Sequence, residues 1–176
     1  IVGYNIDDSA KLAVAALKAG VTLYRAAAGD VIVGKGMESF TITALAPEEK
    51  VHYKDANAAS LTVLAKYGGF SLLLTGDSGT DSEKRYMKKL EEPVSVLKVA
   101  HHGSKYSTSS ELLMRALPAA AFISCSKYNS YGHPAPETLA RLTEAGTEIF
   151  ATPQSGMIIL IYRGGEYFDV TTFTGR

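Results

Sequence analysis

The sequence predicts an α/β or α+β sandwich built on a mixed β-sheet, with residues 1–176 forming a single domain. Three observations carry this prediction. The first half of the chain has short β-type segments, several of them separated by tight glycine-containing turns. In the second half, apolar strands alternate with helices, and this mixture favours a mixed sheet. The 176 residues are 46% hydrophobic, enough to bury one core of ordinary size.

The first half is predicted to contain one helix followed by strands. Residues 7–20 have a helical pattern, with Ser9 as the N-cap and Gly20 as the C-terminal stop. The turn "YGGF", from Tyr67 to Phe70, predicts that the last two strands of this half form a hairpin. The β-type segments are residues 21–26, 30–34, 40–45, 60–67 and 70–76.

In the second half, three helices separate most of the strands. The first helix is expected to start with a capping box from Thr80 to Glu83. The second has the same Thr-x-x-Glu start at Thr108 and Glu111, and the third has Pro136 near its first turn. These helices are predicted at 80–92, 108–117 and 136–146, and the strands at 94–100, 119–126, 147–152, 157–162 and 167–173.

Composition excludes some classes of protein. With 18 basic and 18 acidic residues the net charge is zero, which argues against a protein that coats DNA mainly through counterion release. An enzyme that holds a few phosphates locally stays possible. Cys125 is the single cysteine, so an internal disulfide is excluded, and its apolar neighbours predict a small buried side chain. The apolar runs are too short to span a bilayer, and no signal-peptide pattern is present. Because the chain starts at Ile1 instead of Met, we expect a piece of a longer polypeptide.

An acidic residue and two adjacent histidines follow two predicted strands. Asp77 comes after "LLLTG", where open α/β sheets place ligands, although a turn or helix-capping aspartate is an alternative. His101 and His102 come after "VSVLKVA". If that strand continued, its side chains would alternate between faces, so one histidine would face Asp77 and the other would pack or hydrogen-bond behind it. Imidazole and carboxylate together suit zinc or manganese, so we predict metal ligands here.

A polar loop follows the next strand and contains the fourth candidate, His133, between Gly132 and Pro134. Such a loop could hold a phosphate or donate a proton. A turn made by Asn, Gly and Pro explains the loop equally well, except for the histidine. The polar residues of this loop that we consider as substrate-binding candidates are Ser126, Asn129 and Tyr131, beside Lys127.

Ser104 and Lys105 follow the histidine pair and precede a helix. Together with backbone amides at that helix start they could bind an anion, and ordinary N-cap chemistry is the equal alternative. His52 has no partner pattern and is predicted to lie on the surface. Asn57 and Ser60 precede a strand and could point towards the site, although alone they indicate only a loop.

Four stretches of the sequence together resemble the metallo-β-lactamase-like domain of the ComEC family of competence proteins. They are "NAASLTVLAKYGGFSLLLTGD", "VLKVAHHGS", "SKYNSYGHPAPETLARLTEAG" and "ATPQSGMIIL". The resemblance covers most of the chain and is strongest from Asn57 to Ile159. It implies an αββα sandwich with two divalent metal ions, zinc or manganese, at one sheet edge. It further implies that Asp77 bridges the metals, that His101 or His102 completes the shell of the second metal, and that His133 lies beside the substrate as a catalytic residue.

The chain departs from this family at one point. The family's main metal motif, His-x-His-x-Asp-His, does not occur here. We therefore expect an N-terminally incomplete sandwich that binds metal weakly or not at all as a fragment, since three or four protein ligands are normal. The expected partners are the missing N-terminal part of the same domain, or a second copy in an edge-paired or swapped homodimer, because exposed sheet edges and apolar patches associate.

The resemblance implies a metal-dependent phosphodiesterase or nuclease-type hydrolase of a DNA-uptake protein, inactive as this fragment, with DNA or another phosphoester as substrate. It places the intact protein at the outer face of the cytoplasmic membrane or outside the cell. Two alternatives stay open at this point. One is a hydrolase of small or cell-wall phosphoesters, which the neutral charge suits better, and the other is a non-catalytic binding module on the same scaffold.

Overall fold

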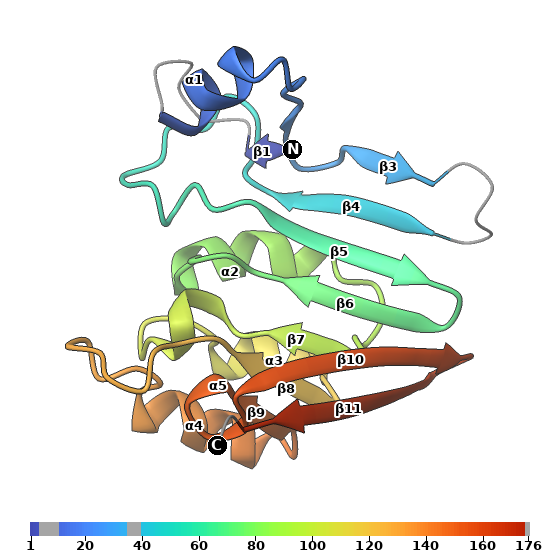
Figure 1. Cartoon of the computed structure of the whole chain (residues 1–176), viewed down its shortest axis with the longest axis vertical. Coiled ribbons are helices and arrows are strands. Elements are labelled where there is room, and N and C mark those ends of the chain that lie inside the picture. Colours follow the sequence, from blue (N-terminus) through green and yellow to red (C-terminus); the bar gives the residue numbers. More distant parts are fainter. Residues whose placement is uncertain (4–10, 35–39, 175–176) are drawn as a thin grey trace.

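A computed structural model describes residues 1–3, 11–34 and 40–174, and its main element is a seven-stranded sheet in the order β3-β4-β5-β6-β7-β8-β9 (Figure 1). The mixed α/β class predicted from the sequence is confirmed. The strands of this sheet are β3 (Val31–Val33), β4 (Thr41–Ala46), β5 (Thr62–Tyr67), β6 (Phe70–Leu74), β7 (Val96–Lys98), β8 (Ala120–Ile123) and β9 (Glu148–Ala151).

The sheet changes direction at β6. Strands β3 to β6 are antiparallel, and β6 to β9 are parallel. The predicted hairpin is confirmed, with Tyr67 paired to Phe70 across the turn between β5 and β6. Because β6, β7 and β8 run in parallel, the residues that follow them meet at one edge of the sheet, which is where the candidate site lies.

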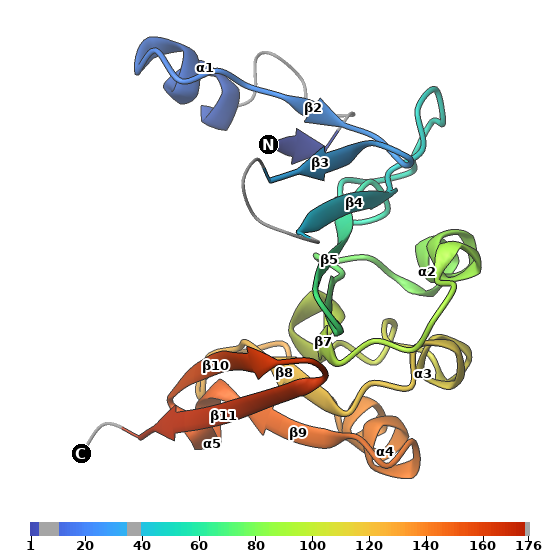
Figure 2. The same cartoon turned by 90° about the vertical axis from the view of Figure 1, so that its right-hand side faces the viewer.

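Helices cover one face of the sheet (Figure 2). They are α2 (Thr80–Tyr86), extended by the 3₁₀ turn η1 (Met87–Lys89), and α3 (Ser110–Ala116) and α4 (Pro136–Glu144). Leu73, Leu97 and Ile123 from the strands pack with Tyr86, Leu112 and Leu142 from the helices, and all six side chains are fully buried. Burial of each such side chain contributes about 1.5–3 kcal/mol, so this layer is the main core.

A hairpin covers the other face of the parallel half. It consists of β10 (Met157–Gly164) and β11 (Tyr167–Phe173), which form a separate two-stranded sheet beside α5 (Thr152–Ser155). Phe70 of the main sheet lies 5.7 Å from the ring centroids of both Tyr162 and Phe168. Aromatic contacts of this kind fix the hairpin over the strands. Figure 2 shows the β10–β11 hairpin on the side of the sheet opposite α2, α3 and α4.

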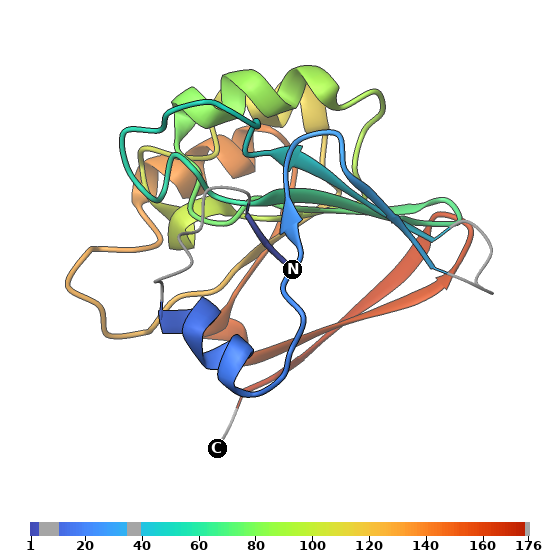
Figure 3. The same cartoon turned by 90° about the horizontal axis from the view of Figure 1, so that it is seen from above.

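The N-terminal part leaves apolar side chains exposed. It contains β1 (Val2–Gly3) and β2 (Arg25–Ala26), paired in parallel, and α1 (Lys11–Lys18), of which only Ala13 is buried. Leu12, Leu17 and Val33 are all more than 60% exposed. A mainly apolar pocket of about 720 Å³ opens against β3, β4 and β5. Figure 3 shows α1 on the side of the sheet opposite the three main helices.

Several local predictions differ from the structure. Both predicted capping boxes are wrong: α2 is capped by Gly79 without a side-chain bond, and α3 by Ser109, whose hydroxyl accepts from Leu112 N at 3.2 Å. The segment 21–26 forms only the two-residue β2, outside the main sheet. The helix predicted at 7–20 is confirmed as α1, but its proposed N-cap Ser9 lies outside the described residues.

Cys125 is half-buried against the main core instead of fully buried. Its thiol pKa is raised by burial, partly offset by the nearby charge of Lys98. Across the described ranges, no helix combines the length and apolar composition needed to cross a bilayer.

Candidate functional site

The adjacent histidines lie in a left-handed turn. After β7 the chain enters η2 (Ala100–Gly103), where His101 has φ 48° and ψ 45°, and His102 has φ 56° and ψ 22°. The strand therefore does not continue through the histidines, and the alternation between faces expected for a continuing strand does not apply. Left-handed backbone at two consecutive non-glycine residues costs about 1–3 kcal/mol each and is concentrated at functional sites.

Hydrogen bonds to three neighbouring segments hold this turn. His101 N donates to Gly76 O at 3.0 Å, which ties the turn to the end of β6. Ser107 Oγ donates to Ala100 O at 3.0 Å. On the other side, Ala135 N donates to Gly103 O at 2.8 Å. The strained conformation is thus fixed by contacts from the ends of β6 and of the β8–α4 loop.

Asp77 and His102 face each other across this edge. Asp77 Oδ1 lies 3.9 Å from His102 Nε2, and both side chains are about half exposed. Asp77 N donates to Ser60 Oγ at 3.1 Å, which fixes the start of the loop. The N-cap of α2 is Gly79, and no side chain caps this helix, so the alternative that Asp77 caps a helix is wrong.

The hydrogen bonding of His102 indicates its tautomer. Its Nδ1 lies 2.6 Å from Ser124 O, and a carbonyl oxygen can only accept, so Nδ1 carries the proton. The lone pair of the neutral ring is then on Nε2, the atom that faces Asp77. Metal-binding histidines commonly donate their second ring nitrogen to a backbone carbonyl in this way. Of the two adjacent histidines, this arrangement favours His102 as the ligand.

His133 completes the group from the β8–α4 loop. Its ring centroid lies 5.8 Å from that of His101 and 5.9 Å from that of Tyr131, which stacks on it at 20°. Asn129 holds its backbone on both sides, with Oδ1 accepting from His133 N at 2.9 Å and Nδ2 donating to His133 O at 2.7 Å.

The His133 ring favours the neutral form. Desolvation lowers the pKa of His133, and the positive charges that His101 and His102 can carry lower the same pKa further. Its Nδ1 is buried and has no hydrogen-bond partner. A neutral imidazole with a free nitrogen can accept a proton or bind a ligand, which distinguishes His133 from a histidine satisfied within the core.

The structure thus brings together Asp77, His101, His102 and His133, the four residues proposed as metal ligands or catalytic group. Their roles stay predictions. In the described part of the chain, no three His, Cys, Asp or Glu side chains are arranged as a ready metal-binding group. The donors are of the type that zinc or manganese binds, but they do not make a complete shell.

Three of the five predicted substrate-binding residues line a pocket beside the histidines. Asn129, Tyr131 and Ser126 line a pocket of about 300 Å³ together with His102 and His133. Ser126 is also part of its own turn, since its Oγ donates to Tyr128 O at 2.9 Å. On the other side of the histidines, a second pocket of about 310 Å³ is lined by Asp77, His101, Asn57 and Tyr106 among others.

The other two candidates, Ser104 and Lys105, do not line either pocket. Ser104 is 3% exposed, and its hydroxyl lies 3.4 Å from Tyr106 N, an arrangement that favours a structural role. Lys105 is exposed, with Nζ 5.2 Å from the ring centroid of Tyr106. His52 is exposed, as predicted.

Two charged residues that sequence reasoning missed hold the segment after the histidines. Glu83 of α2 is fully buried and accepts hydrogen bonds from Thr108 N and, at 2.9 Å, from Ser109 N. Arg141 of α4 donates from Nε to Thr108 O at 2.9 Å and from a terminal nitrogen to Ser107 O at 2.8 Å. The carboxylate of Glu83 therefore binds the backbone N–H of Thr108, and the guanidinium of Arg141 binds its carbonyl oxygen. The φ of Thr108 is 55°, in the left-handed region.

Lys98 is a third residue that the sequence did not single out. It is the last residue of β7, and Nζ donates to Val99 O at 2.9 Å. Burial lowers the pKa of Lys98, while the charge of Asp77 works in the opposite direction. A half-buried lysine in the field of Asp77 provides positive charge at this edge. The sequence feature that could have indicated Lys98 is its position in a strand, two residues before the histidine turn begins.

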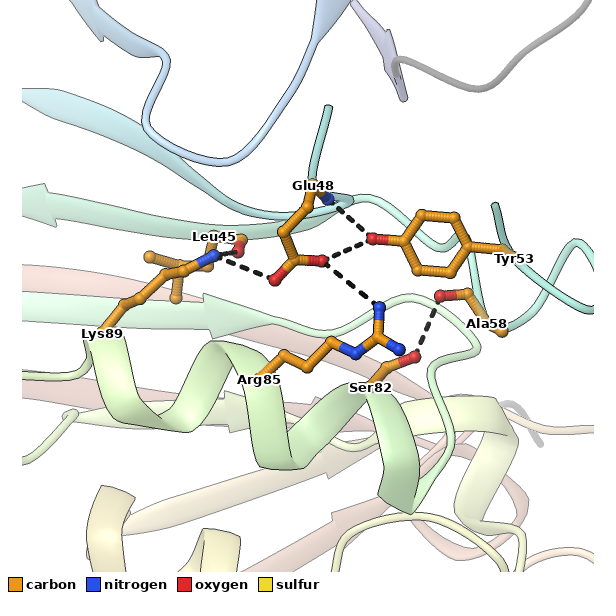
Figure 4. A network of polar contacts seen from close by, with 7 residues as sticks. All are labelled: Leu45, Glu48, Tyr53, Ala58, Ser82, Arg85 and Lys89. Carbon is orange, nitrogen blue, oxygen red and sulfur yellow. Dashed lines mark hydrogen bonds and ion pairs between the residues drawn. The ribbon is translucent and has the colours of Figure 1, made fainter. Parts of the chain in front are cut away.

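A separate network fixes the wall of the second pocket (Figure 4). Glu48 accepts hydrogen bonds from the Tyr53 hydroxyl and, at 3.2 Å, from Lys89 Nζ, and Arg85 lies 3.9 Å away. Ser82 Oγ donates to Ala58 O at 2.9 Å. The loop between β4 and β5 is therefore attached to α2 at both ends. Four residues of this loop line the pocket beside Asp77, namely Lys54, Asp55, Asn57 and Ala58.

Comparison with known proteins shows similarity to several longer proteins, one of which is named as a competence protein. The chain is 33% identical over 154 residues to ComE operon protein 3 of Bacillus subtilis, covering 87% of the chain and 19% of that protein. It is 32% identical over 124 residues to Competence protein ComA of Neisseria gonorrhoeae, covering 69% of the chain and 18% of that protein. In both cases the similarity covers most of this chain but only a minor part of the relative.

A further relative is Recombination protein 2 of Haemophilus influenzae, 35% identical over 114 residues, which are 65% of the chain and 14% of that protein. The chain spans about a fifth or less of the length of these relatives. No family model matches the chain.

Proposed function

We propose that the chain forms part of a metal-dependent phosphodiesterase or nuclease-type centre in a ComEC-like DNA-uptake protein. The observation that carries this proposal is the convergence of Asp77, His102 and His133 at the carboxyl ends of parallel strands. The names of the competence relatives support the DNA-uptake role. The αββα sandwich of the metallo-β-lactamase type is part of the same proposal, supported by helices on one face of the sheet and the β10–β11 hairpin on the other.

In this proposal each residue has its own task. Asp77 and His102 are the metal ligands, with the Ser124 carbonyl keeping the free nitrogen of His102 directed at the carboxylate. A divalent ion held there would activate water and stabilise the phosphate oxygens. His133, kept neutral by its surroundings, accepts or returns a proton beside the substrate. Asn129 positions His133 through its backbone, and Lys98 adds positive charge close to Asp77.

The number of ligands decides how the proposal is tested. Asp77 and one histidine do not fill a shell of three or four protein ligands. We propose that further ligands come from polypeptide outside this chain, so the isolated chain is inactive. The test therefore uses protein expressed with the coding sequence upstream of Ile1, supplied with Mn²⁺ or Zn²⁺, and follows hydrolysis of bis(p-nitrophenyl) phosphate.

Three variants make this test specific. Asp77→Ala and His102→Ala are each expected to lower the rate at least about a hundredfold, because loss of a residue that only supports a metal ligand already costs about 10–100-fold in metal affinity or activity. His52→Ala is the matched control, since His52 is exposed and lies outside both pockets. Equal rates in all three variants would refute the assignment of the site.

A hydrolase of small phosphoesters is the second candidate, favoured by the zero net charge and by pockets of only about 300 Å³. The same protein preparation separates the two candidates. Hydrolysis of bis(p-nitrophenyl) phosphate without cleavage of a DNA oligonucleotide supports the small-substrate enzyme. Absence of both activities in metal-loaded protein supports a binding module.

A further inference from the structure

The side chain of Arg141, in α4, binds the backbone between the histidine turn and α3. Its Nε donates to Thr108 O at 2.9 Å, and its Nη2 donates to Ser107 O at 2.8 Å and to Lys105 O at 3.3 Å. The same Nη2 donates to Thr138 Oγ1 at 3.0 Å, within its own helix. One guanidinium therefore fixes the carbonyl oxygens of three residues in a segment that lies next to the histidines.

Two further residues of this part of the chain bind the start of the same segment. Thr138 Oγ1 donates to Ser104 O at 2.9 Å, and Ala135 N, at the N-cap of α4, donates to Gly103 O at 2.8 Å. Residues three apart on a helix are neighbours, so these two residues and Arg141 form one row, in which Thr138 is fully buried. Together the row binds five backbone oxygens of the segment that begins at Gly103.

The loop that contains His133 leads directly into this helix. Pro134, the next residue, packs against Gly103 of the histidine turn so closely that a Cβ added to Gly103 would lie 2.7 Å from Pro134 Cβ. Side chains do not approach one another to this distance, and Gly103 also has a φ of 83°, which favours glycine. The turn that contains His101 and His102 is therefore packed against the His133 loop as one unit, with the row of α4 residues along its side.

Arg141 reaches the histidine turn through Ser107. The carbonyl of Ser107 accepts from Arg141, and its hydroxyl donates to the carbonyl of Ala100, the residue before His101, at 3.0 Å. In addition, Ser104 N donates to His101 O at 2.9 Å. Because Ser107 is fully buried, it has no space in which to move independently of these partners. A displacement of the segment held by Arg141 would therefore displace the histidines.

We propose that Arg141 is a positioning residue that keeps the histidine turn and the His133 loop in register. The ring centroids of His101 and His133, one from each segment, lie 5.8 Å apart. The importance of this separation for catalysis rests on the proposed hydrolase function. A planar guanidinium presents its donors in a fixed fork and can hold several carbonyls at once, whereas the ammonium of lysine is a point charge on a flexible stem. The position therefore requires arginine and not positive charge alone.

The first test follows hydrogen exchange in the 176-residue chain without metal. Two backbone amides report on the unit: His101 N–H, bonded to Gly76 O, and Ala135 N–H, bonded to Gly103 O. In Arg141→Lys both should exchange about tenfold faster, because loss of hydrogen bonds from a charged group lowers the free energy of local opening. Amides between β6 and β7 should keep their rates. A role in global stability alone would instead raise all rates by the same factor.

Arg115→Lys is the matched control, since Arg115 is an exposed arginine in the last turn of the neighbouring α3. It should leave every exchange rate unchanged. Ser107→Ala is a second variant that keeps the guanidinium. It removes the hydroxyl that binds Ala100 O and should speed exchange at His101 about fivefold, as expected for loss of one neutral hydrogen bond. Circular dichroism shows whether each variant is folded, and Ser107→Ala decides the question if Arg141→Lys does not fold.

The second test measures hydrolysis of bis(p-nitrophenyl) phosphate by the longer protein with Mn²⁺ or Zn²⁺. Arg141 lines neither of the two pockets beside the histidines. Arg141→Lys should therefore lower kcat about tenfold, as expected for a residue that supports a metal site, and leave KM nearly unchanged. Arg115→Lys should change neither constant.

Three results would contradict this role of Arg141: unchanged exchange at His101 and Ala135 in Arg141→Lys, exchange that rises equally throughout the sheet, or an unchanged kcat in an active longer protein. If hydrolysis depends on Asp77 and His102 but not on Arg141, the positioning role alone fails. If the longer protein hydrolyses nothing in any variant, the hydrolase proposal fails, and exchange in the isolated chain still decides whether Arg141 positions the histidines.

Discussion

Glu83 is the residue outside the candidate site whose buried carboxylate we expect to contribute most clearly to the stability of the protein. It accepts hydrogen bonds from Thr108 N and Ser109 N, at the junction between the histidine turn and α3. Glu83→Ala leaves both N–H groups without this acceptor. An unsatisfied buried N–H costs about 1–3 kcal/mol, and Ser109 is only partly buried, so we expect a loss of about 3 kcal/mol in the free energy of unfolding.

A loss of this size is large for a domain with a total stability of about 5–15 kcal/mol. For a chain of this length it lowers Tm by about 6–12 °C. The measurement is urea unfolding followed by circular dichroism, with thermal unfolding alongside. If the slope of the unfolding free energy against urea concentration is unchanged, the variant differs in stability and not in the amount of surface exposed on unfolding.

Glu111→Ala is the matched control for this prediction. Glu111 is an exposed glutamate in the first turn of α3. Surface substitutions of this kind change stability by no more than about 0.5 kcal/mol. If Glu83→Ala and Glu111→Ala unfolded at the same urea concentration, the carboxylate of Glu83 would not support the turn, and the reasoning would be wrong.

Two other predictions concern pH and assembly. Desolvation alone would raise the pKa of Glu48, but hydrogen bonds from Tyr53, its own backbone N–H and Lys89 hold this pKa below the ordinary value of 4.5. The folded state binds this proton less readily than the unfolded state. The contribution of Glu48 to stability is therefore complete above its ordinary pKa and is lost as the pH falls through the lowered pKa. Unfolding curves measured between pH 6 and 3 (roughly the span of the carboxylate titrations) should show that Tyr53→Phe loses less unfolding free energy on acidification than the unchanged chain. The apolar side chains exposed on α1 and β3 predict that the isolated chain associates: native sizing should give a dimer with a single mass under denaturing conditions, or else a second peptide bound to the first. A single intact mass that runs as a monomer would contradict the second prediction.

The sequence predicted the seven strands of the main sheet and the edge at which Asp77 and the three histidines meet, because strand periodicity and the residues that follow each strand are local signals. It did not predict the conformation of His101 and His102. The turn that holds their positive φ angles is fixed by the bond that His101 N donates to Gly76 O and by the bond that Ala135 N donates to Gly103 O, and both partner residues are remote in sequence. Only Gly103, next to them, is of a type that by itself indicates a left-handed turn.

The role of Glu83 could not be found from spacing alone. Thr80 and Glu83 match a capping box, yet the partners of Glu83 are 25 and 26 residues away. One signal was present: Ser82, Glu83 and Tyr86 all lie on the buried face of α2, so a charged residue occupied a core position. A buried charge needs partners, and its position in the helix therefore indicated hydrogen bonds to another segment.

The two members of the proposed ligand pair, Asp77 and His102, are positioned by one hydrogen bond between the segments that follow the parallel strands β6 and β7. His101 N donates to Gly76 O, so the residue before His102 is joined to the residue before Asp77. The carboxylate and the imidazole are thus held 3.9 Å apart by the main chain at this edge, with the carbonyl of Ser124, the residue after β8, fixing the ring. None of these contacts requires a metal ion or a further ligand. We therefore expect this half of the centre to keep its geometry in the isolated chain, so that added polypeptide has only to supply the remaining ligands.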